Sequence, residues 1–410
     1  MKYGLIGERL GHSYSVPIHR AFGVSDYELR PIPREELDAF LTGRGFLGLN
    51  VTIPYKTAVM PYCGKIDARA EAIGCVNTLV VGEDGVMCGY NTDYSGFELM
   101  AARAGISFDG RKVLILGTGG TSKTAHAVAG AHHARDIVFV SRNGETNYEN
   151  VYSKHPDAEI IVNTTPVGMF PLCGQSPIAL ERFGGLLGVL DVIYNPRRTA
   201  LQLEAENLGI PHSDGLIMLV EQARLADELY TGHSIPPEET DRVCRLISQS
   251  IENIVLTGMP GSGKTSVGLA LAEKLGREFF DSDDIIVSRA GMNIPDIFSR
   301  FGEPHFRSLE REVIAELGAK SGVVIATGGG VPVDPRNHAP LRQNGRIYHI
   351  ERSLSLLALD GRPLSTSLDA LRKIQAERAP FYAGLCDRVI TNDGSIASAA
   401  EKIMEDFLRI

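Results

Sequence analysis

The stretch from Asn253 to Thr265 constrains most strongly how this chain can fold. Five strand-forming residues run into Gly258-Met259-Pro260-Gly261-Ser262-Gly263-Lys264-Thr265, which matches G-x-x-x-x-G-K-[ST], and apolar residues from Val267 onward recur at helical spacing. In such a unit the loop N–H groups and the helix N-terminus face phosphate oxygens, while the threonine hydroxyl binds Mg²⁺. The stretch therefore predicts the start of a nucleotide-binding domain, and everything before it must be a separate unit.

Length and charge narrow the class of protein. A chain of 410 residues is expected to hold two to four domains, and 43% hydrophobic with 22% charged residues is ordinary for a soluble protein. The net charge of −9 argues against a nucleic-acid-binding surface and favours small-molecule partners.

The six cysteines and the N-terminus carry further expectations. The cysteines lack C-x-x-C spacing, so neither a zinc site nor a disulfide framework is predicted, and reduced thiols are expected. The chain begins with a strand-like Tyr3–Gly7 segment, and no run of about 18 apolar residues occurs. We therefore expect a cytoplasmic protein without membrane contact. The sequence does not indicate an oligomeric state.

The first hundred residues read as an α/β unit, in which polar clusters follow short apolar runs. Strand ends are where α/β proteins bind ligands, so these clusters are candidate site residues. The expected elements are strand 3–7, a helix near 16–23, strand 27–29, a helix near 34–42 and strand 46–52.

A glycine turn follows at Gly117-Thr118-Gly119-Gly120-Thr121, between the strand Lys112–Leu116 and a helix start. It is a variant dinucleotide-binding fingerprint, in which Ser122 replaces the third glycine. The next strand, Asp136–Val140, ends in Ser141-Arg142, and an arginine there can pair with a 2′-phosphate. NADP is therefore favoured over NAD, although Glu145 weakens this inference and an exposed arginine without such a role is the alternative.

Further strands at Glu159–Thr165 and Gly188–Tyr194 lead to helices at 215–230 and 237–250. The second helix runs almost directly into Asn253, which predicts a stiff join between the halves. We expect three domains: residues 1–100, completed by helices at 215–250; residues 101–214, a Rossmann-like NADP-binding domain; and residues 251–410, a P-loop α/β domain with a parallel sheet.

After the phosphate loop, carboxylates end one strand and three glycines, Gly328 to Gly330, end another. If the chain stays extended after Asp281, then Asp281 and Asp283 point the same way, whereas Asp284 is expected as a solvated helix start. Arginines near a glycine cradle suit a substrate that carries a carboxylate and acquires a phosphate. The three candidates are Arg307, Arg362 and Arg378.

The ordered motifs of residues 1 to about 250 resemble shikimate dehydrogenase. The motifs that carry this resemblance are His12-Ser13-Tyr14-Ser15, Asn50-Val51-Thr52-Ile53-Pro54-Tyr55-Lys56, Gly74-Cys75-Val76-Asn77-Thr78, Asn91-Thr92-Asp93, the glycine turn, Asn163-Thr164-Thr165-Pro166-Val167-Gly168-Met169, Asp191-Val192-Ile193-Tyr194-Asn195-Pro196 and Glu221-Gln222-Ala223. In the first motif, Val16 separates the second serine from Pro17, where the family usually has proline directly.

Residues 252–410 resemble shikimate kinase, so the whole chain looks like a fused bifunctional enzyme. The motifs are the phosphate loop, Asp281-Ser282-Asp283, Phe306-Arg307-Ser308-Leu309-Glu310, Gly328-Gly329-Gly330, Arg362-Pro363-Leu364 and Arg378-Ala379-Pro380-Phe381-Tyr382.

The first resemblance implies reduction of 3-dehydroshikimate with NADPH, with Lys56 and Asp93 as the catalytic pair. It also implies two further groups of site residues. Those for the substrate are Ser13, Ser15, Thr52, Asn77, Tyr194 and Gln222; those for the cofactor are Gly117, Thr118, Gly119, Gly120, Thr121, Arg142, Thr164 and Gly215.

The second resemblance implies transfer of the γ-phosphoryl of ATP onto shikimate. Thr265 and Asp281 are then expected at Mg²⁺, and Asp283 at the shikimate hydroxyls as an orienting or proton-accepting carboxylate. Arg307 and Arg378 are expected at the substrate carboxylate with Gly329 and Gly330 close by, and Arg362 in a mobile lid. The nucleotide is expected at Gly261, Ser262, Gly263, Lys264, Thr265, Ser266 and Arg362.

Two alternatives stay open. The first is a quinate/shikimate dehydrogenase that uses NAD, joined to the same kinase. The second, from a different class, is a ligand-sensing regulatory protein, which would predict damaged catalytic positions and a DNA-binding motif or basic patch. The intact lysine, aspartate and arginine positions favour an enzyme.

Overall fold

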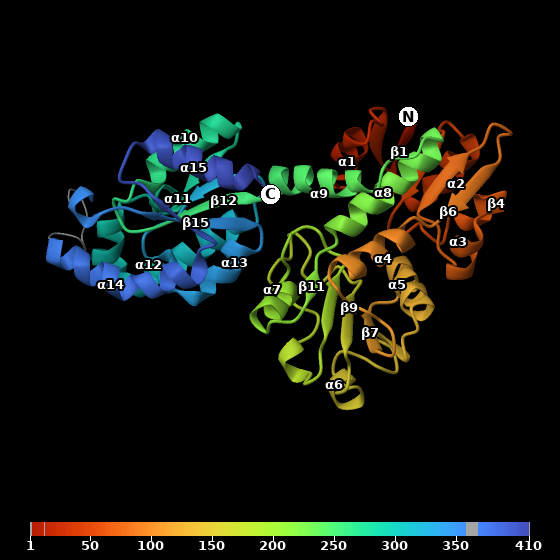
Figure 1. The fold of residues 1–410 in the computed structure, drawn as a ribbon, viewed down its shortest axis with the longest axis horizontal. Helices are drawn as coiled ribbons and strands as arrows, with labels where there is room; N and C mark the ends of the chain where they lie inside the picture. Colours follow the sequence, from red (N-terminus) through yellow and green to blue (C-terminus); the bar gives the residue numbers. More distant parts are fainter. Residues whose placement is uncertain (1, 12, 358–367, 410) are drawn as a thin grey trace. The chain divides into compact units, whose positions relative to one another are not determined.

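The computed structural model describes residues 2–11, 13–357 and 368–409. The chain divides into two compact units, one made of Met1–Asn195 with Thr199–Ile247 and the other of Pro196–Arg198 with Ser248–Ile410. Figure 1 shows the sheets of each unit with their surrounding helices. None of the helices described is long and apolar enough to cross a membrane.

The first sheet of the first unit is mixed and has the strand order β2-β1-β3-β5-β6-β4. β1 pairs in parallel with β2 and β3, whereas β5 is antiparallel to both β3 and β6. Its strands are β1 (Tyr3–Gly7), β2 (Tyr27–Pro31), β3 (Gly48–Val51), β4 (Lys65–Ile66), β5 (Thr78–Val81) and β6 (Met87–Tyr90), and the helices of this region are α1 (Ser15–Ala21), α2 (Leu37–Gly43) and α3 (Ala68–Ile73).

Two helices and one strand expected in this region have different bounds in the structure. The helix expected near 16–23 lies at Ser15–Ala21, so Ser15 itself begins α1. The helix expected near 34–42 opens with a 3-10 turn at Arg34–Glu36 before α2 begins. The strand expected at 46–52 is confined to Gly48–Val51, which leaves Thr52 just beyond its end.

The second sheet of the first unit is parallel, in the order β11-β10-β9-β7-β8. Its strands are β7 (Lys112–Leu116), β8 (Asp136–Val140), β9 (Ile160–Asn163), β10 (Gly188–Asp191) and β11 (His212–Ser213). The remaining helices of this unit are α4 (Asp93–Arg103), α5 (Gly120–Ala131), α6 (Val151–Lys154), α7 (Ala200–Asn207), α8 (Leu216–Thr231) and α9 (Glu238–Ile251), the last of which ends in the second unit.

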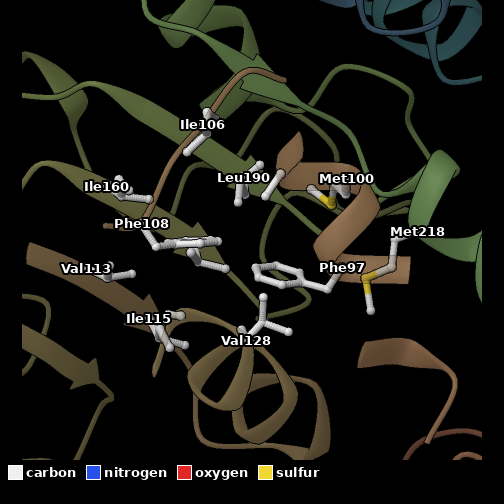
Figure 2. Close-up of a cluster of buried hydrophobic side chains, with 14 residues drawn as sticks. Phe97, Met100, Ile106, Phe108, Val113, Ile115, Val128, Ile160, Leu190 and Met218 are labelled. Carbon is white, nitrogen blue, oxygen red and sulfur yellow. The ribbon is translucent and has the colours of Figure 1, made fainter. Parts of the chain in front are cut away.

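Successive residues of β7 point to opposite faces of this sheet. Val113 and Ile115 belong to the cluster drawn in Figure 2, in which Phe97 and Met100 of α4 and Val128 of α5 cover them. Leu114 and Leu116 belong to the cluster on the other face, with side chains such as Leu201 and Ala205 of α7. Because both faces are buried, the strand is apolar from Val113 to Leu116, as expected for a parallel sheet.

The sheet of the second unit is also parallel, in the order β13-β14-β12-β15-β16, as predicted for the kinase-like half. Its strands are β12 (Asn253–Thr257), β13 (Phe279–Asp281), β14 (Val324–Ala326), β15 (Gly345–Glu351) and β16 (Arg388–Thr391), and its helices are α10 (Lys264–Leu275), α11 (Ser282–Ala290), α12 (Ile294–Gly318), α13 (His338–Arg342), α14 (Leu368–Leu385) and α15 (Ile396–Leu408).

Here β12 shows the same alternation between two cores. Ile254 and Leu256 pack under α10 and α15, while Val255 lies in the cluster that includes side chains of α11, α12 and α13. Because neighbouring parallel strands run in the same direction, the carboxyl ends of β12, β15 and β16 lie at the same edge of the sheet.

Candidate active sites

Lys56 and Asp93 form a close ion pair in the first unit. The Lys56 Nζ lies 2.6 Å from Asp93 Oδ2, and the two side chains are only 13% and 8% exposed. Lys56 follows β3, while Asp93 is the first residue of α4. Burial opposes the charged ammonium, but the Asp93 carboxylate and its hydrogen bond outweigh this, so the pKa of Lys56 is raised. The pair can hold a proton on nitrogen and fix its direction.

The predicted carboxylate-binding serines lie together at the start of α1. Ser13 Oγ donates a hydrogen bond to Ser15 Oγ at 3.0 Å and accepts one from the Ser15 N–H at 3.2 Å. The hydroxyls therefore stay paired although Val16 separates Ser15 from Pro17. Thr52, which follows β3, is half-buried.

Asn77 and Gln222 lie in one buried hydrogen-bond network. Asn77 Nδ2 donates to Thr92 Oγ1 at 3.0 Å and to Gln222 Oε1 at 3.4 Å. The Thr92 N–H donates back to Asn77 Oδ1 at 2.7 Å, which fixes the residue just before Asp93. Helix α8, which carries Gln222, packs against α4 and α1. Helix packing thus brings Gln222 to a group of residues from the first hundred positions.

Asn50 is part of this network although sequence reasoning assigned it no role. Its Nδ2 donates to Gln222 Oε1 at 3.4 Å, and its Oδ1 accepts hydroxyl hydrogen bonds from Tyr27 at 2.8 Å and Tyr230 at 3.0 Å. Asn50 stands in a polar cluster at a strand end, which was the available signal, whereas nothing in the sequence singled out either tyrosine.

The glycine turn borders a cavity of about 740 Å³. Gly117 has a φ of +105°, and a Cβ there would stand 2.9 Å from Thr164 Oγ1, so only glycine fits without strain. Ser122, at the third glycine position, turns its Oγ onto the Gly119 carbonyl at 2.6 Å. Predicted site residues that line the cavity are Lys56, Gly117, Thr118, Gly119, Gly120, Thr121, Arg142 and Thr164.

Two other predicted residues of this half are placed differently. Gly215 caps α8 and packs against the Val192 backbone, where a Cβ would collide, and it is not among the residues that line the cavity. The Tyr194 ring lies 5.5 Å from the Tyr14 ring, and burial raises the pKa of Tyr194 to about 12. Close packing against the Val192 backbone is therefore itself a reason for glycine at position 215.

The phosphate loop of the second unit has the backbone that its glycines predict. Gly258, Gly261 and Gly263 have φ values of +150°, +85° and +94°. The Lys264 Nζ donates to the carbonyl oxygens of Gly258 at 3.0 Å and Met259 at 3.1 Å, so the ammonium lies within the curve of its own loop.

The segment after Asp281 is not extended, so the condition under which Asp281 and Asp283 would point the same way is not met. Asp281 caps α11, since its Oδ1 accepts a hydrogen bond from the Asp283 N–H at 3.0 Å, and Asp283 lies in the first helical turn. A carboxylate at the position directly before the first helical residue is a favourable cap, and this decided the local conformation. Asp281 Oδ2 also accepts from Thr265 Oγ1 at 2.8 Å. Asp284 is exposed, as expected.

Asp283 and the arginines nevertheless surround the three glycines. A Cβ on Gly328 would stand 2.5 Å from Asp283 Oδ1, and one on Gly330 would stand 2.5 Å from the Arg307 guanidinium. Arg378 donates to the Gly329 carbonyl at 2.9 Å. Burial, and then the Asp281 carboxylate, raise the pKa of Asp283 to about 6.

Arg307 is bound to carboxylates that the sequence analysis did not single out. It donates to Glu310 at 2.9 and 3.0 Å and to Glu303 at 3.0 and 3.2 Å. The helical spacing of these glutamates was the available signal. The Glu310 side chain is only 2% exposed, and burial raises its pKa. Arg362 lies outside the described residues.

Comparison with known proteins assigns the two halves separately. A family model described as shikimate dehydrogenase substrate binding domain matches residues 5–79, and one described as shikimate kinase matches residues 260–408. A shikimate dehydrogenase (NADP(+)) of Clostridium perfringens is 34% identical over 265 residues, which are 59% of this chain and 96% of that protein.

Solved structures give the same assignment for the first half. A chorismate mutase/shikimate 5-dehydrogenase fusion protein from Clostridium acetobutylicum has a TM-score of 0.56 at 34% identity, over 60% of this chain and 97% of its own. Quinate dehydrogenase from Corynebacterium glutamicum in complex with NAD has a TM-score of 0.53 at 26% identity, over 60% and 98%. The chain therefore belongs to the shikimate dehydrogenase family and joins its dehydrogenase to a shikimate kinase domain, as a bifunctional enzyme of the shikimate pathway.

Proposed function

We propose that the first unit reduces 3-dehydroshikimate to shikimate with NADPH and that the second transfers the γ-phosphoryl of ATP to shikimate, forming shikimate 3-phosphate. The observation that carries the first step is the 2.6 Å Lys56–Asp93 pair, whose lysine lines the same cavity as the glycine turn. The product of the first reaction is then the substrate of the second.

In the reduction, Lys56 is the proton donor. Bound NADPH supplies the hydride that adds to the carbonyl carbon, and the oxygen gains negative charge as it does so. The Lys56 ammonium donates its proton to that oxygen, while Asp93 orients the ammonium and keeps it charged before transfer. The pair thus serves as acid and orienting group.

The substrate is held by hydroxyl and amide groups around this pair. Ser13 and Ser15 bind its carboxylate, while Thr52, Asn77 and Gln222 bind the ring hydroxyls, with Tyr194 as a further substrate-binding residue. The 3.0 Å contact between the serine hydroxyls and the shared Asn77–Gln222 network support this role, because a lone turn cap needs no such convergence.

The cofactor is NADPH, bound along the glycine turn. Arg142, which lines the cavity with Ser141, is proposed to pair with the 2′-phosphate. One observation supports the alternative, a quinate/shikimate dehydrogenase that uses NAD: the similarity to a quinate dehydrogenase in complex with NAD. We also propose domain bounds at residues 1–100 with helices at 215–250, at 101–214 and at 251–410.

In the kinase half, the chain supplies charge and orientation around the transferred phosphoryl group. Lys264 neutralises the phosphates. Thr265 would hold Mg²⁺ directly and Asp281 would hold it through water; their oxygens lie 2.8 Å apart, and oxygen is the ligand that this ion prefers. Asp283 orients the acceptor hydroxyl or takes its proton. Bound Mg²⁺ neutralises charge on the phosphate oxygens.

The acceptor is held by its carboxylate. Arg307 and Arg378 bind this group next to Gly329 and Gly330, in the geometry that a guanidinium offers to two oxygens. Arg362 is proposed to close over the reacting phosphate. The substrate carboxylate would replace contacts that these arginines now make to Glu303, Glu310 and the Gly329 carbonyl.

The test supplies 3-dehydroshikimate, NADPH and Mg-ATP to the full chain and follows NADPH oxidation and ADP release together. Both signals are expected, with ADP release dependent on prior reduction. Absence of one signal in folded protein removes that half of the proposal, and absence of both favours a ligand-sensing protein. Two substitutions separate the NADP-dependent shikimate dehydrogenase from the NAD-using quinate/shikimate dehydrogenase. NADH replaces NADPH in the reduction, and quinate replaces shikimate in the reverse, oxidative direction.

A further inference from the structure

Arg352 is an arginine at the phosphate loop that neither the sequence motifs nor the comparisons assign. It directly follows β15, the neighbour of β12 in the sheet. One terminal nitrogen of its guanidinium lies 4.0 Å from the point where a Cβ on Gly263 would stand. Its Nε is buried and has no hydrogen-bond partner among the described residues.

Asn392 meets the same glycine from the next strand. It follows β16, its Nδ2 donates to the Ser262 carbonyl at 2.8 Å, and a Cβ on Gly263 would stand 2.5 Å from that nitrogen. Asn392 Oδ1 and Ser262 Oγ are also buried without a hydrogen-bond partner in the described part of the chain. Two strand ends therefore bring polar atoms with unused bonding capacity to one side of the phosphate loop.

The nearby carboxylate leaves the Arg352 donors available. Asp393 accepts hydrogen bonds from Ser353, from its Oγ at 2.5 Å and from its N–H at 2.7 Å. The hydrogen bonds from Ser353 are the main reason that the pKa of Asp393 is lowered, and the positive charge of Arg352 lowers it less. Arg352 thus holds a positive charge at the loop without a hydrogen bond to that carboxylate. Buried donors of this kind are normally paired, so an acceptor is expected there.

We propose that Arg352 is an additional nucleotide-binding residue, whose guanidinium contacts the phosphate chain of the nucleoside triphosphate on the Gly263 side of the loop. The inference rests on the proposed kinase function. A phosphate is the favoured ligand because the loop N–H groups beside Gly263 bind phosphate oxygens and a guanidinium matches two such oxygens. Lys264 would act within the curve of the loop and Arg352 from its β15 side, while Asn392 positions the loop backbone.

The test measures binding of Mg-ATP and of Mg-tripolyphosphate to the full chain by calorimetry, without shikimate. Arg352→Gln is expected to weaken both by about tenfold or more, because one charge-assisted contact is lost in each. Arg388→Gln is the matched control: it removes the same charge from the opposite end of the neighbouring strand β16 and is expected to change neither. The KM for shikimate should stay the same in both variants.

Unchanged affinity of Arg352→Gln for both ligands would overturn the proposal. Weaker ATP binding with unchanged tripolyphosphate binding would also overturn it, since the contact would then be to base or sugar. If Arg352→Gln does not fold, Arg352→Lys carries the test, with a smaller loss expected for both ligands because the charge stays and the planar fork is lost. A wild-type chain that binds neither ligand would instead refute the kinase function.

Discussion

The two candidate active sites differ in what their charged groups contact. In the dehydrogenase half, Lys56 and Asp93 contact each other in a largely buried ion pair at 2.6 Å. In the kinase half, Arg307 contacts Glu303 and Glu310, and Lys264 contacts carbonyl oxygens of its own loop. If these residues have the proposed roles, the first site is already arranged for chemistry, whereas the second exchanges internal contacts for substrate contacts.

This difference has an energetic consequence. A preorganised pair needs little free energy of reorganisation to reach the transition state, so removing the pair mainly lowers the rate of the chemical step. Groups that exchange one partner for another contribute to the binding free energy only the difference between two contacts. Removing such groups therefore mainly weakens substrate binding. The predictions below test this division, beginning with the largest expected effect.

Lys56→Ala should lower the rate of reduction by about 10²–10⁴ while the kinase reaction stays nearly unchanged, because the proton donor is lost from one unit only. Steady-state NADPH oxidation and ADP release measure the two activities. Lys65→Ala is the control, since this lysine is exposed and pairs only loosely with Asp84 at 3.7 Å. Near-normal reduction by the Lys56 variant would refute the assignment of the acid.

Arg307→Lys should weaken shikimate binding by about 1–3 kcal/mol, because lysine cannot supply the guanidinium fork. Calorimetry should show nearly constant ATP affinity in the absence of shikimate. Arg289→Lys provides the control, because Arg289 also makes a two-point contact, to Glu316, but on the exposed surface. A loss of ATP binding with intact shikimate binding would place Arg307 in the nucleotide site.

Arg142→Asp should raise the KM for NADPH by about tenfold or more and that for NADH much less, since only NADPH carries a 2′-phosphate. Steady-state kinetics with both cofactors measure this, and NADH serves as the internal control. Equal effects on both cofactors would mean that Arg142 does not read the phosphate and would favour the NAD-using alternative.

The remaining effect is on the stability of the dehydrogenase half and not on its activity. Asp191 is fully buried, and burial raises its pKa to about 7 although Thr199, the Ile193 N–H and Asn163 donate to it. Between about pH 4 and this value the folded unit binds a proton that the unfolded chain has lost, so this carboxyl makes stability fall as pH rises.

Asp191→Asn should therefore flatten the pH dependence of thermal unfolding of the first unit between about pH 4 and 7. Scanning calorimetry across this range measures it, and the transition of the second unit should keep its pH dependence. A wild-type unit whose stability rises with pH in parallel with the variant would show that the Asp191 carboxyl does not titrate in this window.

Local patterns in the sequence determined much of the architecture. The strands expected at Lys112–Leu116, Asp136–Val140 and Asn253–Thr257 coincide with β7, β8 and β12. β7 and β12 are buried on both faces and therefore carry runs of apolar residues, and turns that need positive φ require glycine, so both signals are readable without a fold. The phosphate loop and the glycine turn were predictable for the same reason.

Only the tertiary structure decided which side chains meet. Asn50 and Gln222 are 172 positions apart and bond because α8 packs against α4 and α1, an arrangement that no local period encodes. Arg352 reaches Gly263 only because β15 lies beside β12 in the sheet. Sequence periodicity specifies which face of each element is buried. Strand order and helix packing specify which elements lie next to it, and this arrangement depends on burial summed over the whole chain.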